Sequence, residues 1–364
     1  MSKTFRLLQL IIAMTLTAGC ASPAPRANPT QALPEANAPV SVPANDHRGY
    51  LSREEVQVFA LEVSQNRQIP LPSVTALLGQ ANKLPMAIRL MAPPDPGQAK
   101  SVRDWVRYRG IFVEPIRIRK GRAFFEAHRQ TLALAEDRFG VPANIIVAII
   151  GVETLYGEHK GNYRVLDAIT TLSFDYPDPN RPDRVVMFQG QLADLIELHH
   201  QGKIDATRQL GSYAGAMGIP QFMPTSVKSF SASATDQPTV DLENNVADAI
   251  FSVGRFLQIH GWIGGLPVFA PVNLPPDPHA LVDGGLTPTL DWTILKDNGA
   301  SLAPGTMSPA PWMGYPLGII DLPMPTQNTA QYRTATPNFF ALTQYNRSYF
   351  YAAAVTDLAA AIGP

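Results

Sequence analysis

Apolar residues recur at helical spacing along most of the chain between residues 50 and 263. The pattern starts after Ser52, whose spacing to Glu55 is that of a capping box, so we expect a helix to begin there. Pro142 opens an almost continuous apolar segment, 142–156, and proline in the first turn is typical of a helix start. The same periodicity predicts further helices at residues 70–81, 121–139, 164–172, 185–201 and 246–260.

The pattern changes in residues 264–337, which are rich in proline and glycine and contain only short apolar segments. Such a stretch predicts loops with a few short strands. An apolar helical pattern returns at residues 348–362. The sequence therefore predicts a mainly α fold of the α+β class, in which a small β element interrupts the helices.

The N-terminus predicts a secretory signal peptide over residues 1–19. Lys3 and Arg6 precede an apolar segment that is too short to cross a bilayer comfortably. Small residues then lead to Cys20, which resembles the lipobox of bacterial lipoproteins, in which this cysteine is acylated. Ala21 follows it, which favours the outer membrane in such proteins. We expect a lipid anchor at Cys20 and a location at the periplasmic face of the outer membrane.

Residues 20–46 predict a tether between that lipid and the globular part. They hold six prolines among alanine, asparagine and serine, without hydrophobic periodicity. Such a composition predicts a semi-rigid, largely extended chain.

Composition and charge exclude several classes of protein. The 364 residues include 29 basic and 30 acidic side chains, and only 16% are charged. Without residues 1–19 the balance is 27 basic against 30 acidic, or −3, which argues against nucleic-acid binding and against electrostatic docking on anionic lipid. Cys20 is the only cysteine, so a disulfide framework and a cysteine-ligated metal are excluded. Metalloprotease, nucleophile-elbow and P-loop motifs are missing, and no cofactor is expected.

Glu153 is the strongest candidate for chemistry. It lies in the apolar helix predicted at 142–156 and shares a face with Ile146, Ile149 and Ile150. A carboxyl group in such surroundings is desolvated, which disfavours the anion and raises its pKa. A carboxylic acid that keeps its proton near neutrality can donate it to a leaving oxygen. The alternative is a glutamate at a helix end that reaches water or pairs with an arginine.

Four segments carry a resemblance to a known family: residues 151–177, 211–227, 257–262 and 336–355. They occur in the order found in the family of membrane-bound lytic murein transglycosylase B, and the resemblance extends from about Tyr50 to the C-terminus. It implies a lysozyme-like helical catalytic core with an additional helical lobe. On this basis we expect four units, listed here: a helical lobe at 47–140, the catalytic core at 141–263, a small β region at 264–337, and a C-terminal helix at 338–364 that packs on the core.

The resemblance also implies an activity on peptidoglycan glycan strands. Members of this family cleave the β-1,4 bond between N-acetylmuramic acid and N-acetylglucosamine and leave a 1,6-anhydromuramyl ring. The resemblance makes Glu153 the single catalytic acid and base. It first protonates the glycosidic oxygen and then takes the proton from the muramyl C6 hydroxyl. One carboxyl group suffices because the nucleophile belongs to the substrate, whereas common glycosidases need a pair.

Further site residues follow from matching positions in the family. In the segment 211–227, Ser212 and Gln221 match polar residues of the cleft and Phe222 an aromatic wall. The segment 336–355 contributes Tyr345, Asn346 and Tyr351, and Tyr108 matches a tyrosine of the cleft. Packing of the last helix is the competing interpretation for Tyr351. Aromatic rings beside amide groups are what sugar recognition requires.

The chain departs from the family at two places. Some members carry an EF-hand-like calcium loop in the region that corresponds to 231–248, but here only scattered carboxylates such as Asp236, Asp241 and Glu243 remain. We therefore predict that no calcium and no other metal binds.

The second departure concerns basic residues. The basic pair that some members carry after residues 171–177 is only partly replaced by Arg181 or Arg184. His199 and His200 have no partner at metal-ligand spacing and are expected to face solvent.

Three other functions stay open at the level of sequence. A lysozyme-like hydrolase would need a second carboxylate, for which Asp167 and Asp175 are candidates. A non-catalytic wall-binding lipoprotein would keep the aromatic and amide residues but would not need Glu153. Binding to cell-wall synthesis proteins, as a scaffold, is compatible with either.

Overall fold

The computed structural model describes residues 49–94, 97 and 103–363. The predicted signal peptide, Cys20 and the tether lie outside these residues. Fourteen α-helices and three small antiparallel sheets make up the described part, which confirms the mainly α prediction. Within the same part, no helix has both the length and the apolar character that crossing a bilayer requires.

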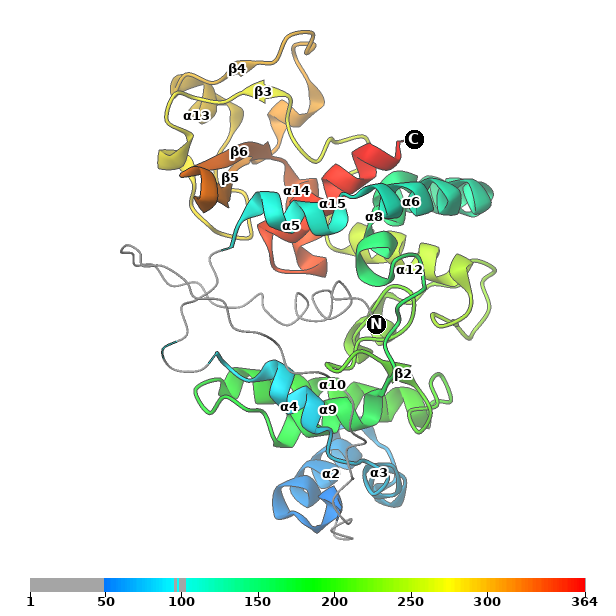
Figure 1. Cartoon of the computed structure of the whole chain (residues 1–364). Helices are drawn as coiled ribbons and strands as arrows, with labels where there is room; N and C mark the ends of the chain where they lie inside the picture. The colour runs from blue at the N-terminus through cyan, green and yellow to red at the C-terminus, as the bar shows by residue number, and fades with distance from the viewer. Residues whose placement is uncertain (1–48, 95–96, 98–102, 364) are drawn as a thin grey trace.

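The larger of two helical cores surrounds α8 (Ala143–Thr154). Every residue of this helix from Ile145 onward is buried, as expected of a helix that is apolar on all sides. Helices α6 (Pro115–Ala127), α7 (Arg129–Phe139), α12 (Val246–Ile259) and α15 (Tyr349–Ile362) contact it directly, and α5 (Trp105–Phe112) and α14 (Pro337–Tyr345) pack against α15 (Figure 1).

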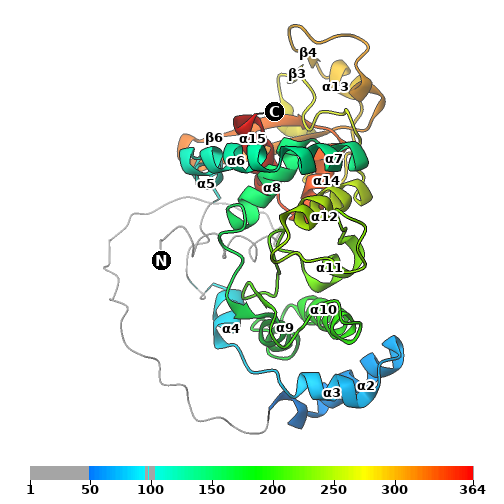
Figure 2. The same ribbon diagram turned by 90° about the vertical axis from the view of Figure 1, so that its right-hand side faces the viewer.

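The second core lies between α9 (Val165–Phe174) and α10 (Pro182–His200), at the lower end of Figure 1. The N-terminal helices cover it, and Figure 2 shows them at the far end of the molecule from the β region. A short helix, α11, contacts both α10 and α12 and so links the two cores. The remaining helices of this part are η1 (Tyr50–Ser52), α2 (Glu54–Arg67), α3 (Leu71–Leu78), α4 (Pro85–Met91) and α11 (Pro224–Phe230).

The predicted β region forms a small lobe with its own core around Trp312 and Leu295. Its main feature is a hairpin in which seven residues of β5 pair with β6, from Gly318 opposite Ala335 to Met324 opposite Thr329. The strands are β3 (Val272–Asn273), β4 (Ser301–Leu302), β5 (Gly318–Met324) and β6 (Thr329–Ala335); a separate pair, β1 (Tyr163–Arg164) and β2 (Leu210–Gly211), lies among the helices. The short helices of this lobe are η2 (Pro278–Leu281), α13 (Trp292–Asp297), η3 (Pro311–Gly314) and η4 (Pro325–Gln327).

Three local predictions need correction. The first helix is capped by Arg53 rather than Ser52, whose hydroxyl donates to the Gly49 carbonyl. The helix expected at 121–139 is two helices, because His128 leaves the helical conformation between α6 and α7. The C-terminal unit expected as one helix at 338–364 holds two helices, since Asn346 is extended and Ser348 caps a new one, which confirms the helix predicted at 348–362.

The expected lobe at 47–140 is divided between the two cores. Its first part, from Tyr50 to Ala81, packs against α9 and α10. Its second part, from Trp105 to Phe139, packs with α8 and α15. Each helix buries its apolar face against another element with a matching apolar face. Its position along the chain therefore does not decide which core it joins.

Candidate active site

Glu153 lies in the last turn of α8, at the centre of the larger core. Only 6% of its surface is exposed. The helix ends directly after it, because Leu155 and Tyr156 both adopt the left-handed conformation. The predicted burial of this carboxyl group is confirmed. No cation among the described residues pairs with it.

One hydrogen bond fixes the carboxyl group. The hydroxyl of Tyr351 on α15 donates to Glu153 Oε1 over 2.6 Å. Burial raises the pKa of Glu153 to about 7, and the bond from Tyr351 partly opposes that rise. The C-terminal end of α8 carries partial negative charge, which also disfavours the anion. Glu153 is therefore an acid that holds its proton up to neutral pH.

Two further tyrosines surround this pair. The rings of Tyr345 and Tyr351 lie almost parallel, with centroids 6.3 Å apart. Tyr108 comes from α5, and the charge of Glu153 acts on Tyr108, Tyr345 and Tyr351 alike. Burial raises the pKa of each of the three phenols, and the nearby carboxylate raises it further. All three are neutral donors at physiological pH.

Two buried polar atoms near this cluster have no hydrogen-bond partner among the described residues: the hydroxyl of Tyr108 and Oδ1 of Asn346. Asn346 follows Tyr345 directly in the chain. Buried polar groups without a partner are rare in folded proteins, because each one costs free energy. The charge of Glu153 acts on Tyr108, and Asn346 adjoins Tyr345, so both groups are candidates for binding a substrate.

Ser212 and Gln221 both lie in the loop between β2 and α11. Each side chain forms hydrogen bonds with nearby backbone groups. The Ser212 hydroxyl accepts the backbone N–H groups of Ala214 and Ala216, at 3.3 and 3.0 Å. Gln221 has a φ of 53°, and its amide donates to the carbonyls of Lys160 and Gly218. In this structure both side chains hold the loop in shape, and their predicted contact with substrate stays a prediction.

The shaped loop in turn supports the site. Its Pro220 carbonyl accepts the hydroxyl of Tyr345 at 2.7 Å, and its Ile219 carbonyl accepts the hydroxyl of Thr154 at 2.9 Å. Phe222 is 2% exposed and packs against the ring of Tyr345. We conclude that Phe222 supports Tyr345 from behind rather than lining an open surface.

Thr154 and Arg117 are supporting residues that sequence reasoning does not single out. Thr154 adjoins Glu153, and its hydroxyl also accepts the N–H of Gly157. Arg117 is buried and its Nε donates to the Gly151 carbonyl near the end of α8. The position of Thr154 beside the acid was the one available signal, whereas nothing in the local pattern marks Arg117.

The carboxylates considered as partners for a hydrolytic mechanism are used elsewhere. Asp167 accepts from Arg164 and from the backbone of Asn82. Asp175 pairs with Arg53 at 3.0 Å and with Lys83 at 3.3 Å. Neither influences the pKa of Glu153, for which burial and Tyr351 are the operative causes.

The described residues contain no group of three or more histidine, cysteine, aspartate or glutamate side chains that could hold a metal ion. In the segment considered for calcium, Asp236 pairs with Arg138 and Glu243 with Lys160. The absence of bound calcium stays a prediction, and these cations near the carboxylates support it.

His199 differs from the prediction that it faces solvent. It is half-buried, and its Nδ1 lies within hydrogen-bond distance of the Ile204 carbonyl and the Ala206 N–H. It therefore holds the turn after α10, while His200 is exposed. Arg181, one of the two arginines considered as a partial replacement for the basic pair of the family, forms an ion pair with Asp183.

A cavity of about 270 Å³ lies beside the tyrosine cluster. Arg103, Arg347, Tyr349 and Phe350 are among the residues that line it. The ring of Phe350 is 5.3 Å from that of Tyr108, so one lining residue contacts the tyrosine cluster, although Glu153 and the three tyrosines are not part of the lining. The two arginines were not singled out by sequence reasoning, although Arg347 directly follows Asn346 in the chain.

Comparison with known proteins places this geometry in context. The family model described as "Transglycosylase SLT domain" matches residues 52–360. The chain is 34% identical over 292 residues to membrane-bound lytic murein transglycosylase B of Escherichia coli K12, which covers 79% of this chain and 76% of that protein.

Solved structures agree with the sequence match. The lytic transglycosylase SltB1 of Pseudomonas aeruginosa, solved in a catenated form, superimposes with a TM-score of 0.75 at 32% identity, covering 85% of this chain and 97% of that one. The Escherichia coli lytic transglycosylase Slt35 in complex with bulgecin A gives 0.72 at 31% identity, covering 86% and 94%. SltB3 of Pseudomonas aeruginosa, in complex with NAG-NAM-pentapeptide, gives 0.69 at 26% identity, covering 84% and 78%.

Proposed function

The chain belongs to the SLT-domain family of peptidoglycan lytic transglycosylases, and from this premise we propose that Glu153 is its single catalytic acid and base. The observation that carries the proposal is a buried carboxyl group without a cation, whose pKa is raised to about 7. Such a group is divided between its acid and its base form near neutral pH. Both forms are needed in one catalytic cycle.

In the first step, neutral Glu153 donates its proton to the oxygen of the glycosidic bond. The bond from C1 of N-acetylmuramic acid to that oxygen breaks, and N-acetylglucosamine leaves with the new hydroxyl. Tyr351 donates to Oε1, so the transferred proton is carried by Oε2. The same bond stabilises the carboxylate that results.

In the second step, the Glu153 carboxylate accepts the proton of the muramyl C6 hydroxyl. The C6 oxygen forms a bond to C1, and the 1,6-anhydro ring closes. The carboxyl group ends the cycle protonated, and no water is consumed. This route needs no second carboxylate, in agreement with the ion pairs that occupy Asp167 and Asp175.

The surrounding groups suit the recognition of the sugar. The Tyr108 hydroxyl and Asn346 Oδ1 have no hydrogen-bond partner among the described residues and offer a donor and an acceptor to hydroxyl or acetamido groups of the substrate. Tyr345 is oriented by Pro220 and stands beside Tyr351. Arg103 and Arg347 line the adjoining cavity with one acidic residue, Asp321, and the two guanidinium groups suit the carboxylates of a peptide stem.

Product analysis by mass spectrometry tests the proposal. Wild-type protein should release muropeptides that are lighter than hydrolytic products by one water, about 18 Da. Glu153→Gln should lower the rate at least about 10³-fold while binding of glycan strands persists. The control is Glu126→Gln, an exposed glutamate on α6 that pairs with Arg129, which should keep full activity. Hydrolytic products, or full activity of Glu153→Gln, would refute the assignment.

We further propose that Cys20 carries a lipid anchor that holds the enzyme at the periplasmic face of the outer membrane. The support is the lipobox-like sequence and the relative described as membrane-bound. Cys20→Ala should move the protein from the membrane fraction to the soluble fraction, and continued sedimentation with membranes would count against the anchor. Association with cell-wall synthesis proteins stays a prediction.

A further inference from the structure

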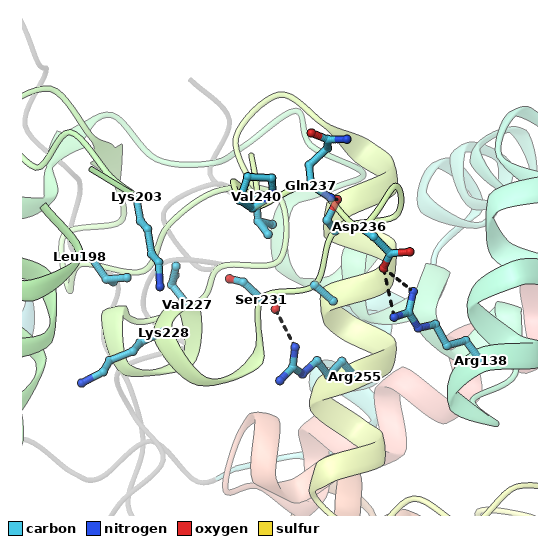
Figure 3. Close-up of a pocket in the computed structure, with 13 residues that line it drawn as sticks. Arg138, Leu198, Lys203, Val227, Lys228, Ser231, Asp236, Gln237, Val240 and Arg255 are labelled. Carbon is cyan, nitrogen blue, oxygen red and sulfur yellow. Dashed lines mark hydrogen bonds and ion pairs between the residues drawn. The ribbon is translucent and has the colours of Figure 1, made fainter. Parts of the chain in front are cut away.

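A second cavity, of about 330 Å³, lies among α7, α10, α11 and α12. Figure 3 shows its lining. Basic side chains reach it from four segments: Arg138 at the end of α7, Lys203 after α10, Lys228 on α11 and Arg255 on α12. The only acidic side chain of the lining is Asp236.

Two of these four cations have no carboxylate partner among the described residues. Lys228 forms ion pairs with Asp194 and Glu197, and Arg67 pairs with the same two carboxylates. The two positive and two negative charges of this group balance. In Figure 3 the ammonium group of Lys228 points away from Arg255.

Of the other three cations, Arg138 alone has a carboxylate partner among the described residues. Asp236 lies 3.3 Å from Arg138. No carboxylate of the described residues lies within ion-pair distance of Lys203 or Arg255. The guanidinium of Arg255 donates to the Ser231 carbonyl at 3.2 Å. The pocket therefore keeps an excess of about two positive charges.

The loop that closes the cavity is held in a fixed shape. The buried carboxylate of Asp248 accepts the N–H groups of Ala234 and Asp241, both at 3.0 Å. The buried hydroxyl of Ser252 accepts the N–H of Ala232 at 2.9 Å. Both acceptors lie on α12, so the loop and Arg255 are parts of one frame. A preorganised pocket loses little entropy when it binds a ligand.

Ser231 is also part of the lining. The hydroxyl of Ser231 is buried and has no hydrogen-bond partner among the described residues. It lies beside Arg255, which donates to the carbonyl of the same residue. The guanidinium of Arg255 and the ammonium group of Lys203 can only donate to a bound group, whereas the Asp236 carboxylate, an acceptor, is paired with Arg138.

We propose that this pocket binds an oxyanion, a phosphate or a carboxylate group of a small ligand. Excess positive charge, donor groups and a fixed frame are what such a ligand requires. The pocket is separate from the reacting centre, since Arg255 is on the exposed side of α12 while the adjacent Phe256 packs against Tyr345, 4.7 Å between ring centroids.

Titration with two probes tests the proposal. Full-length protein at low ionic strength is titrated with inorganic phosphate and, separately, with muramyl dipeptide, while the amide resonances of residues 231–237 are followed by NMR. The test variant is Lys203→Gln combined with Arg255→Gln. The control is Arg129→Gln, an exposed arginine of α7 outside the cavity. Glu153→Gln should bind like the wild type, which separates this site from the catalytic assignment.

The expected result is saturable binding to the wild type that weakens at least about tenfold in the double variant and is unchanged in Arg129→Gln. Binding of muramyl dipeptide would identify a carboxylate of the wall as the source of the anion, and binding of phosphate alone would identify free phosphate. If the double variant does not fold, Lys203→Gln alone should weaken binding about threefold. Two results would overturn the proposal: no saturable signal with either probe, or variants that bind as tightly as the wild type.

Discussion

Acidic side chains are held in opposite ways on the two sides of this molecule. Around α9 and α10, Asp175 lies 3.0 Å from Arg53, and Asp194 lies 3.1 Å from Lys228. In the other core, Glu153 has no cation beside it and receives one hydrogen bond from a neutral tyrosine. The first arrangement joins helices, whereas the second stores a proton.

The presence of a cation decides the sign of the pKa shift. Burial alone would raise the pKa of Asp175, but hydrogen bonds from Tyr50 and Arg53, with the charges of Arg53 and Lys83, lower it overall. Burial of Glu153 is opposed only by Tyr351, so its pKa rises to about 7. A buried acidic side chain is therefore a candidate catalytic residue when no cation lies close enough to pair with it.

The largest expected effect concerns stability against pH. The folded-state pKa of Glu153, about 7, exceeds its ordinary value of 4.5, so the native state binds more protons between these limits. Wild-type stability should fall by about 3 kcal/mol as pH rises through that window. Glu153→Gln has no such proton and should lack this contribution. Urea unfolding at pH 5 and pH 8 measures the difference, with Glu126→Gln as a control that should parallel the wild type. Parallel curves for Glu153→Gln would contradict the account.

An intermediate effect is expected for Tyr351→Phe. The lost hydrogen bond normally lowers the pKa of Glu153, so its pKa should rise above about 7. The alkaline limb of the pH–rate profile should move to higher pH. The maximal rate should fall about tenfold, because the carboxylate formed in the first step loses a donor.

The matched control for that experiment comes from the other region. Tyr50→Phe also removes a phenol that donates to a carboxylate, that of Asp175 at 2.8 Å. It should leave the pH–rate profile unchanged. A shifted profile in Tyr50→Phe, or an unshifted one in Tyr351→Phe, would remove the distinction between the two regions.

The smallest effect is expected for Asp175→Asn. It breaks partly exposed ion pairs with Arg53 and Lys83 and should lower the free energy of unfolding by about 1 kcal/mol at pH 7. Because the folded pKa of Asp175 is lowered, this contribution exists above the ordinary pKa of about 4 and is lost as pH falls further. Chemical denaturation at pH 7 and pH 3 measures it. Asp183→Asn, at an exposed pair with Arg181, should show no such change. Loss of catalysis in Asp175→Asn would support a second catalytic carboxylate instead.

Local pattern was sufficient to predict the helix that carries the site. The almost continuous apolar character of residues 142–156 predicts an apolar helix, and α8 is that helix, buried from Ile145 onward. A single glutamate among isoleucines then predicts desolvation. The break at His128 has no comparable signal, since residues on both sides favour helix and tertiary packing decides the kink.

Contacts between distant segments could not be predicted in this way. The bond from Tyr351 to Glu153 spans 198 positions, and that from Tyr345 to Pro220 spans 125. Periodicity shows which face of a helix is buried but not which residue lies opposite. For the same reason the sequence did not reveal that residues 47–140 are shared between two cores.

The role of polar residues in tight loops is also difficult to predict from sequence. Ser212 and Gln221 have the residue types of a sugar site, but their side chains bond to nearby backbone groups. Short polar side chains satisfy the backbone wherever a turn leaves N–H or C=O groups unpaired. Residue type alone does not distinguish that use from contact with a ligand.

The most direct test is a carbon-13 NMR titration of the Glu153 side-chain carboxyl group in the full-length protein. The account predicts an apparent pKa near 7, well above the ordinary value of 4.5. A carboxyl resonance that titrates at or below 4.5 would contradict it, because the group would then carry no proton to donate at neutral pH.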